Sequence, residues 1–345
     1  MSSSTSSISP TTPSTTPSIS PSTPASSFST SPSPSSPNMT LATRALMRDV
    51  HFYDSNDPSV VLGGLVLNRG VTNKNFHAML EVLIIPSENN GCITLDDDQP
   101  FFSLKDTAEN IIPRDDLPLK PGDYYIVGPF VINNEQTSGR MISVGTGRRT
   151  HGFRDAVRRR DGRCWVTGEE PPSAEFGEWS GLEAAHVVPL AFEGCWSLNN
   201  YDRWITFPPK EGGNINSVQN GLLLRSDVRQ LFDSYGFSIN PDDDHKIVFF
   251  TNDSSKNRSG KHIERSLLDH PERPPDQLLR WHFRQAVLAN MRGGGEPLME
   301  FDFPPGSDDV GCILNGPNAN QRMEFELFDR LGAQLDLFPE TSVVH

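Results

Sequence analysis

The chain has 345 residues, enough for about two domains of ordinary size. Its formal net charge of −14 argues against broad, non-specific adhesion to nucleic acid, so any phosphate-binding surface must gather its positive charge locally. No apolar run approaches the roughly 18 residues that a membrane span needs, which predicts a soluble protein without a membrane partner. Four scattered cysteines and no signal peptide are typical of free thiols in a reducing compartment, so we expect an intracellular protein, nuclear or cytoplasmic.

Residues 1–40 consist almost entirely of Ser, Thr and Pro. Such a segment cannot bury enough apolar surface to offset its ordering entropy, so it is expected to be a disordered, low-complexity tail. It lacks acidic residues, as organellar transit peptides do, but arginine is absent before Arg44. A tail that can be phosphorylated is therefore the favoured interpretation.

Residues 41–147 change to short apolar runs separated by turn residues, a pattern that predicts a β-rich domain of unknown role. Strands are expected at 60–67, 78–85 and 124–127, with a turn at 89–91.

The next region, 148–252, contains the most informative stretch. Residues 182–189 alternate towards His186 and stop at a proline, which predicts a strand that presents the histidine at its end. Residues 220–229 begin with an Asn-Gly turn signal, continue with three leucines, and then reach Ser-Asp at the start of an amphipathic helix. Strand, strand and helix in this order form a compact ββα unit.

A basic window precedes this unit and includes a helix expected at 153–160. On an otherwise acidic chain it is a candidate phosphate-facing edge, in which Arg158 and Arg159 are the candidate substrate-binding residues. The alternative is a solvated helix whose arginines pair with carboxylates elsewhere. The arginines of the window are Arg140, Arg148, Arg149, Arg154, Arg158, Arg159, Arg160 and Arg163.

A hairpin is expected to close the region, with strands at 236–240 and 245–250 around an acidic turn that we interpret as solvated. The insert at 188–220 contains tryptophans, which are interpreted as packing anchors of their own loop.

Two segments follow. Residues 253–295 are expected to be a helical extension, with Asp276 as the N-cap of a helix that ends at a triple glycine and packs on the preceding domain. Residues 296–345 are an acidic segment with a short amphipathic helix at 323–331.

The region from Arg154 to about Phe250 resembles an HNH (His-Asn-His) endonuclease domain of the fungal type. His186 matches the first histidine of the motif and Asn220 matches the asparagine. The second histidine should fall nine residues after the asparagine, where this chain has Arg229. The resemblance implies an α+β protein with a ββα-metal domain, a β-rich N-terminal domain and a helical C-terminal extension.

The resemblance also implies metal-dependent hydrolysis of nucleic-acid phosphodiesters, with DNA preferred to RNA as the substrate. In that family, the residue at His186 is the general base, because a histidine accepts a proton near neutral pH. The residue at Asn220 ties the two arms of the ββ loop together. A divalent ion, usually Mg²⁺, supplies positive charge where negative charge develops.

Arg229 departs from this pattern, because a guanidinium has no lone pair to give and stays protonated. The position before the first histidine, a ligand in many HNH proteins, is Ala185. Candidate metal ligands are therefore Asp227 and Glu183, with Asp233 as a further carboxylate. Arg229 could alternatively clamp a substrate phosphate.

Many HNH domains also bind a structural zinc, and this chain lacks residues of the required type at the ligand positions. Cys164 is followed by Thr167 where a second cysteine is usual, and the later positions are Arg225 and Val228. Four N or S donors are needed, so no structural zinc is expected and Cys164 is interpreted as a small buried residue.

Two functions follow from these observations. The first is an active, metal-dependent HNH-type endonuclease with His186 as general base. The alternative is a catalytically weakened or inactive HNH-fold module that binds nucleic acid or a protein partner, because Arg229 replaces the metal-ligand histidine.

Overall fold

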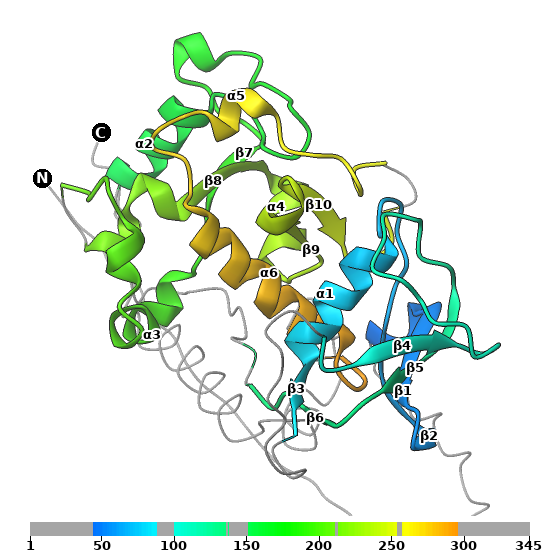
Figure 1. The fold of residues 1–345 in the computed structure, drawn as a ribbon. Coiled ribbons are helices and arrows are strands. Elements are labelled where there is room, and N and C mark those ends of the chain that lie inside the picture. The colour runs from blue at the N-terminus through cyan, green and yellow to red at the C-terminus, as the bar shows by residue number, and fades with distance from the viewer. Residues whose placement is uncertain are drawn as a thin grey trace, which may run out of the picture. The chain divides into compact units, whose positions relative to one another are not determined.

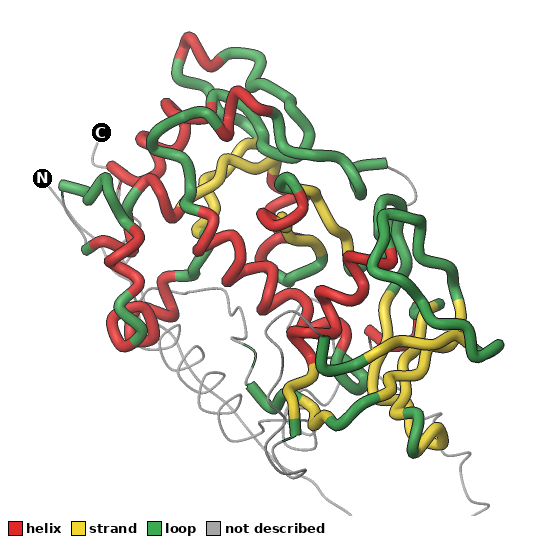
Figure 2. Tube along the Cα trace, in the orientation of Figure 1, coloured by secondary structure: helices red, strands yellow, loops and turns green. Residues whose placement is uncertain are grey.

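The computed structural model describes residues 44–87, 100–135, 137, 151–210, 213–253 and 257–295. Contacts divide the chain into two units, Met1–Thr40 and Leu41–His345, and all of the described residues belong to the second. The tail, the turn at 89–91 and the helix expected at 323–331 lie outside the described residues. Helices, short strands and loops are mixed along the described chain, which confirms the α+β class (Figure 2).

The N-terminal part is built on a four-stranded sheet with the strand order β2-β1-β5-β4. The β1 and β5 strands are parallel, and the β1–β2 and β4–β5 pairs are antiparallel. Strands β3 and β6 form a separate antiparallel pair. The elements of this part are η1 (Arg44–Met47), β1 (Val50–Asp54), β2 (Asp57–Leu65), α1 (Asn73–Leu83), β3 (Ile84–Pro86), β4 (Ser103–Asp106), β5 (Gly122–Val127) and β6 (Phe130–Ile132).

The strands expected at 60–67 and 124–127 are confirmed as β2 and β5, but the strand expected at 78–85 was wrong. Most of that segment belongs to α1, whose first turn is fixed by a capping box between Thr72 and Asn75. Its buried apolar residues recur at helical spacing, so the helix covers the sheet core with one face. They are Phe76, Met79, Leu80 and Leu83.

The central part contains the predicted ββα unit. Strands β7 (Leu182–His186) and β8 (Gly221–Arg225) pair antiparallel, and α4 (Ser226–Asp233) follows directly. The helix expected at 153–160 is confirmed as α2 (His151–Asp161). The connection between the strands holds the short helices η3 (Leu190–Phe192), α3 (Glu193–Leu198), η4 (Tyr201–Trp204), η5 (Asn214–Asn216) and η6 (Val218–Asn220), and η2 (Ala174–Phe176) lies before β7.

The closing hairpin is also confirmed, as β9 (Phe237–Asn240) and β10 (Lys246–Phe249) around η7 (Pro241–Asp243). Two helices follow, α5 (Arg265–Leu268) and α6 (Asp276–Met291). The N-cap of α6 is Pro275 and not Asp276, because the extended residue is the proline and the aspartate already lies in the first turn. None of the helices in the described ranges is long and apolar enough to cross a membrane.

Helix α6 joins the two parts of the described chain. It packs on β9 along one side and on α1 along another (Figure 1). Leu278 and Leu279 at its start belong to the core around the ββα unit, whereas Phe283 and Val287 belong to the core of the N-terminal part. One helix therefore contributes side chains to both apolar cores. The predicted packing of this helix on the central part is confirmed.

A buried ion pair anchors α2 to the ββα unit. The side chains of Arg160 and Asp161 are both 1% exposed and are joined by two hydrogen bonds of 2.6 and 2.7 Å. Arg160 also donates to the carbonyls of Val218 and Gly221 at 2.6 and 2.7 Å, and Asp161 accepts from the Leu223 amide at 2.9 Å. These bonds satisfy both charges inside the protein, so Arg160 is structural and is not part of a phosphate-facing edge.

We predict that Asp161→Ala lowers the free energy of unfolding by about 3–5 kcal/mol, because it leaves a buried guanidinium uncompensated. Urea denaturation followed by circular dichroism measures this loss. The control is Asp155→Ala on the same helix, where the exposed pair with Arg154 is worth about 0–1 kcal/mol. Equal losses in the two variants would contradict the prediction.

Candidate functional site

His186 ends β7 and lies against α2. Its imidazole stacks face to face on the ring of Phe153, with the ring centroids 3.8 Å apart and an interplanar angle of 8°. The residue is 8% exposed and its Nε2 atom is buried. One face of the imidazole is thus covered by the Phe153 side chain, and Nε2 has no contact with solvent.

Gly221 explains how α2 comes so close to the histidine. It lies opposite His186 in the β7–β8 register, and a Cβ there would approach Val157 and Phe153 to 2.6 and 2.7 Å. The residue has an extended backbone with φ −135°, and Asn220 before it ends a 3-10 helix. The Asn-Gly pair is therefore not a turn, and the glycine is required by the close approach of the α2 side chains.

Asn220 holds the loop that follows His186. Its side chain is fully buried, and its Oδ1 accepts from the Val188 amide at 2.9 Å. Its Nδ2 donates to the carbonyls of Val188 and Ile215 at 2.9 and 2.8 Å. The Asn220 carbonyl in turn accepts from the Val187 amide at 2.8 Å. One amide group therefore joins the end of β7 to the segment that leads into β8.

His186, proposed from the sequence as the base, and Glu183, proposed as a metal ligand, lie on different faces of β7. Side chains alternate along a strand, so Glu183 and Ala185 share one face while His186 is on the other. The contacts agree with this alternation, because His186 meets Phe153 of α2 and Glu183 meets Arg229 of α4. The structure thus brings Arg229, Glu183 and Asp233 together but places the imidazole against another helix.

Arg229 occupies the α4 side of the strand. Its guanidinium forms an ion pair with Glu183 through Nη1 and with Asp233 through Nε, the latter at 3.1 Å. Only 17% of the arginine side chain is exposed. Both carboxylates are consequently engaged with a permanent cation, and this cation is in turn neutralised before any phosphate arrives.

Asp227, the other candidate ligand, is paired with Arg225 at 2.7 Å. Arg225 also bonds Glu169 at 2.8 Å, and the hydrogen bonds to Asp227 and then to Glu169 raise the pKa of Arg225. Within the described ranges, no group of three or more His, Cys, Asp or Glu side chains is arranged to hold a metal ion. The residues present therefore do not fit the divalent ion that the resemblance implies.

The structure also shows the loop at Cys164, where many HNH domains carry a pair of zinc-binding cysteines. Cys164 is buried with a free thiol, and its Sγ accepts the amides of Thr167 and Arg225 at 3.5 and 3.4 Å. The bridge from Glu169 through Arg225 to Asp227 joins the same loop to the start of α4. Ion pairs and weak thiol hydrogen bonds therefore make the connection between the loop and the helix.

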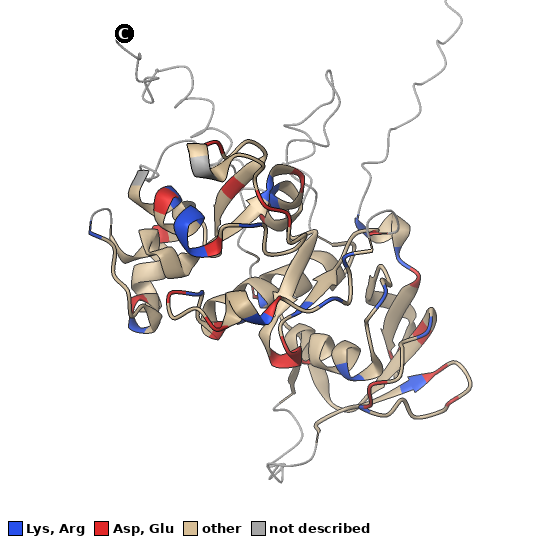
Figure 3. Cartoon of the chain, turned by 90° about the horizontal axis from the view of Figure 1, so that it is seen from above, with Lys and Arg blue, Asp and Glu red and all other residues tan. Residues whose placement is uncertain are grey.

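Arg158 and Arg159 of α2 are the described arginines of the basic window that were proposed to bind a phosphate. Arg158 lies over the Trp179 ring at 5.3 Å, and burial together with the nearby Arg154 lowers the pKa of Arg158. Arg159 is exposed. Basic and acidic segments alternate over the described chain and do not gather into one large region (Figure 3). Arg140, Arg148 and Arg149 lie outside the described residues.

The insert between the strands packs on itself, as predicted. Trp196 is 2% exposed and donates from Nε1 to Asp202 at 2.6 Å. Trp204 stacks on Tyr201 with centroids 4.8 Å apart. These aromatic side chains are anchors of their own loop.

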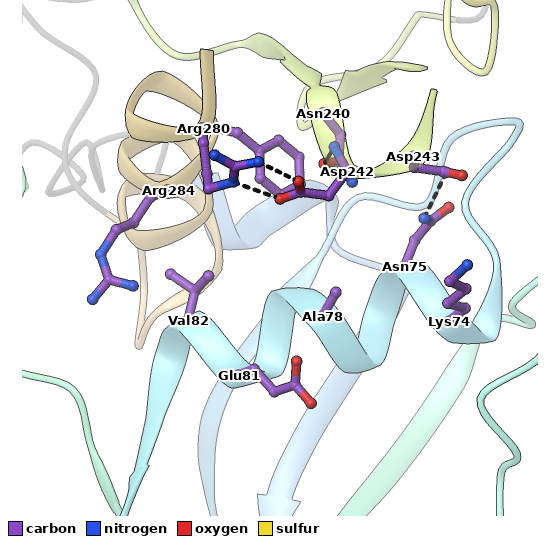
Figure 4. A pocket seen from close by; sticks show the side chains of 11 residues that line it. Lys74, Asn75, Ala78, Glu81, Val82, Asn240, Asp242, Asp243, Arg280 and Arg284 are labelled. Atoms are coloured by element: carbon purple, nitrogen blue, oxygen red, sulfur yellow. Dashed lines mark hydrogen bonds and ion pairs between the residues drawn. The ribbon is translucent and has the colours of Figure 1, made fainter. Parts of the chain in front are cut away.

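A cleft of about 310 Å³ opens between α1, η7 and α6 (Figure 4). The interpretation of the acidic turn as solvated is confirmed for Asp242 and Asp244, which are exposed, whereas the Asp243 side chain is only 20% exposed. Arg280 holds Asp242 with two hydrogen bonds, and Asp243 accepts from Asn75 at 2.8 Å (Figure 4). The turn therefore links the two parts of the chain, and only the position of α1 beside it, unknown from the sequence, reveals this role.

Two family models match the chain. Residues 164–240 match the model described as HNH endonuclease, and residues 47–132 match a domain of unknown function (DUF8573). The first match covers β7, β8 and α4, so the ββα unit is similar to an HNH nuclease domain. No curated protein and no solved structure matches the chain.

We predict that Asn220→Ala lowers the free energy of unfolding by at least about 3 kcal/mol, because it leaves one amide and two carbonyls buried without partners. Chemical denaturation measures the change. Asn199→Ala is the matched control, since Asn199 is exposed and makes one side-chain bond to the Cys195 carbonyl at 2.8 Å. A loss no larger than that of the control would show that the loop does not depend on the Asn220 amide.

Proposed function

We propose that this chain is a nuclease-like HNH-fold protein that engages nucleic acid and cleaves phosphodiesters weakly or not at all. The observation that carries the proposal is the Glu183–Arg229–Asp233 ion-pair group on the α4 side of β7. It uses the carboxylates that could have helped to bind an ion. The similarity of residues 164–240 to HNH endonucleases supports nucleic acid as the partner.

Phosphate contact is assigned to α2. Arg159 is exposed, and Arg158 is spread over an indole whose flat face adjoins the same helix. Guanidinium groups neutralise phosphates bidentately, so an exposed arginine on this helix can contact a nucleic-acid backbone without reading its bases. Duplex DNA is the polymer proposed, with RNA as the comparison. Free thiols at Cys164 and Cys195 support a reducing compartment, nuclear or cytoplasmic, as part of the proposal.

A second candidate is an active endonuclease with His186 as general base, and the bracing of its loop by Asn220 favours it. In such a reaction, the neutral imidazole takes a proton from water while the resulting hydroxide attacks phosphorus and the sugar oxygen leaves. Nε2 of the stacked ring is buried, so this nitrogen must first reach solvent if it is to take the proton. Binding of nucleic acid along α2 would have to move Phe153 or the ring to permit this.

We predict little or no nicking of supercoiled plasmid by the purified chain in Mg²⁺ or Mn²⁺, and the same result for His186→Ala. The reason is that charge neutralisation at the scissile phosphate lacks a divalent ion. Agarose electrophoresis over time measures nicking. Robust Mg²⁺-dependent nicking that disappears in His186→Ala would establish the second candidate instead.

We predict that Arg159→Ala weakens binding to a fluorescent DNA duplex and reduces the slope of log affinity against log salt by about 0.9, the contribution of one phosphate contact. The double variant with Arg158→Ala and Arg159→Ala should reduce this slope by about 1.8. Fluorescence anisotropy at several salt concentrations measures both. Arg265→Ala on α5 is the control, because Arg265 is 78% exposed and pairs with Asp269. An unchanged slope in both α2 variants would rule out this helix as the contact surface.

A further inference from the structure

The Glu183–Arg229–Asp233 group joins two elements that are distant in the sequence. Glu183 comes from β7, and Arg229 and Asp233 lie four residues apart on α4. Residues at this spacing share one face of a helix, which is also the spacing of paired metal ligands on helices. Two carboxylates thus converge on one point from two elements, and a guanidinium fills that point.

The charges of this group do not cancel. One guanidinium faces two carboxylates, which leaves a formal charge of −1. About 40% of each carboxylate side chain is exposed, so an ion could reach the group from solvent. The arginine opposes the binding of an ion there, because it repels cations and offers no lone pair.

We infer that Arg229 is a built-in substitute for a divalent cation: it holds together the two carboxylates that an ion would otherwise bridge, and it keeps the native chain from binding an ion there. The inference concerns this one residue and does not depend on whether the chain binds nucleic acid. Its consequence is that one substitution should convert the ion-pair group into a metal site. In Arg229→His the introduced imidazole would offer a lone pair between the two carboxylates, giving a mixed N and O donor set that suits Mn²⁺, Co²⁺ or Zn²⁺.

The test titrates Mn²⁺ into the full chain by isothermal titration calorimetry. Arg229→His is expected to bind one equivalent at least about tenfold more tightly than the native chain. Adding Glu183→Gln or Asp233→Asn to Arg229→His should abolish the gain. Visible absorption of bound Co²⁺ gives an independent signature of an ion held by nitrogen and oxygen ligands.

Two controls separate the lone pair from the charge. Arg229→Lys keeps a cation and should show no gain, whereas Arg229→Leu removes the cation without adding a ligand and should gain less than Arg229→His. Circular dichroism confirms that each variant is folded.

The native chain provides a test even if Arg229→His does not fold, since Glu183→Gln alone should leave its Mn²⁺ affinity unchanged. The inference is overturned by a native Mn²⁺ site that is lost in Glu183→Gln, because the ion would then displace the arginine. It is also overturned if folded Arg229→His shows no gain. DNA affinity, measured separately, reports on the proposed function alone.

Discussion

The side-chain amide of Asn220 is the interaction on which the geometry of the central region depends. It is fully buried, and it binds the chain just after His186 on one side and the entry to β8 on the other. A buried amide that makes three well-formed hydrogen bonds fixes both segments, because losing any one of them leaves a polar group without water or partner. The direction of the β7 end, and with it the position of the imidazole, follows from this constraint.

The two parts of the described chain are not independent bodies linked by a flexible connection. Helix α6 contributes to both apolar cores, and the acidic turn after β9 is held by Arg280 of α6 and Asn75 of α1. The buried His282 of α6 stacks on Phe232 of α4, with the ring centroids 3.8 Å apart. Helix α6 therefore also supports the helix that carries Arg229. A change in the N-terminal part therefore has a direct packing route to the ββα unit.

Local patterns were sufficient to predict the ββα unit, because alternation before His186 and the apolar run after Asn220 are both short-range signals. The same kind of reading failed at 78–85, where the apolar run spans the end of α1 and the start of β3. The helix is recognisable only from Thr72 and the spacing that starts at Phe76. The partners of Arg229 and the stacking of Phe153 on His186 depend on contacts across the fold, which no local pattern contains.

The fold and the chemistry of this region are separable, and the reason is electrostatic. In a metal-dependent site the ion both neutralises carboxylates and polarises the phosphate. The guanidinium of Arg229 can do the first, since it pairs with Glu183 and Asp233 at the junction of β7 and α4. It cannot do the second to the same degree, because its single charge is delocalised and already engaged. Under the proposed function, Arg229 therefore keeps the junction between β7 and α4 in the ββα unit without supplying the charge that cleavage of a phosphodiester needs.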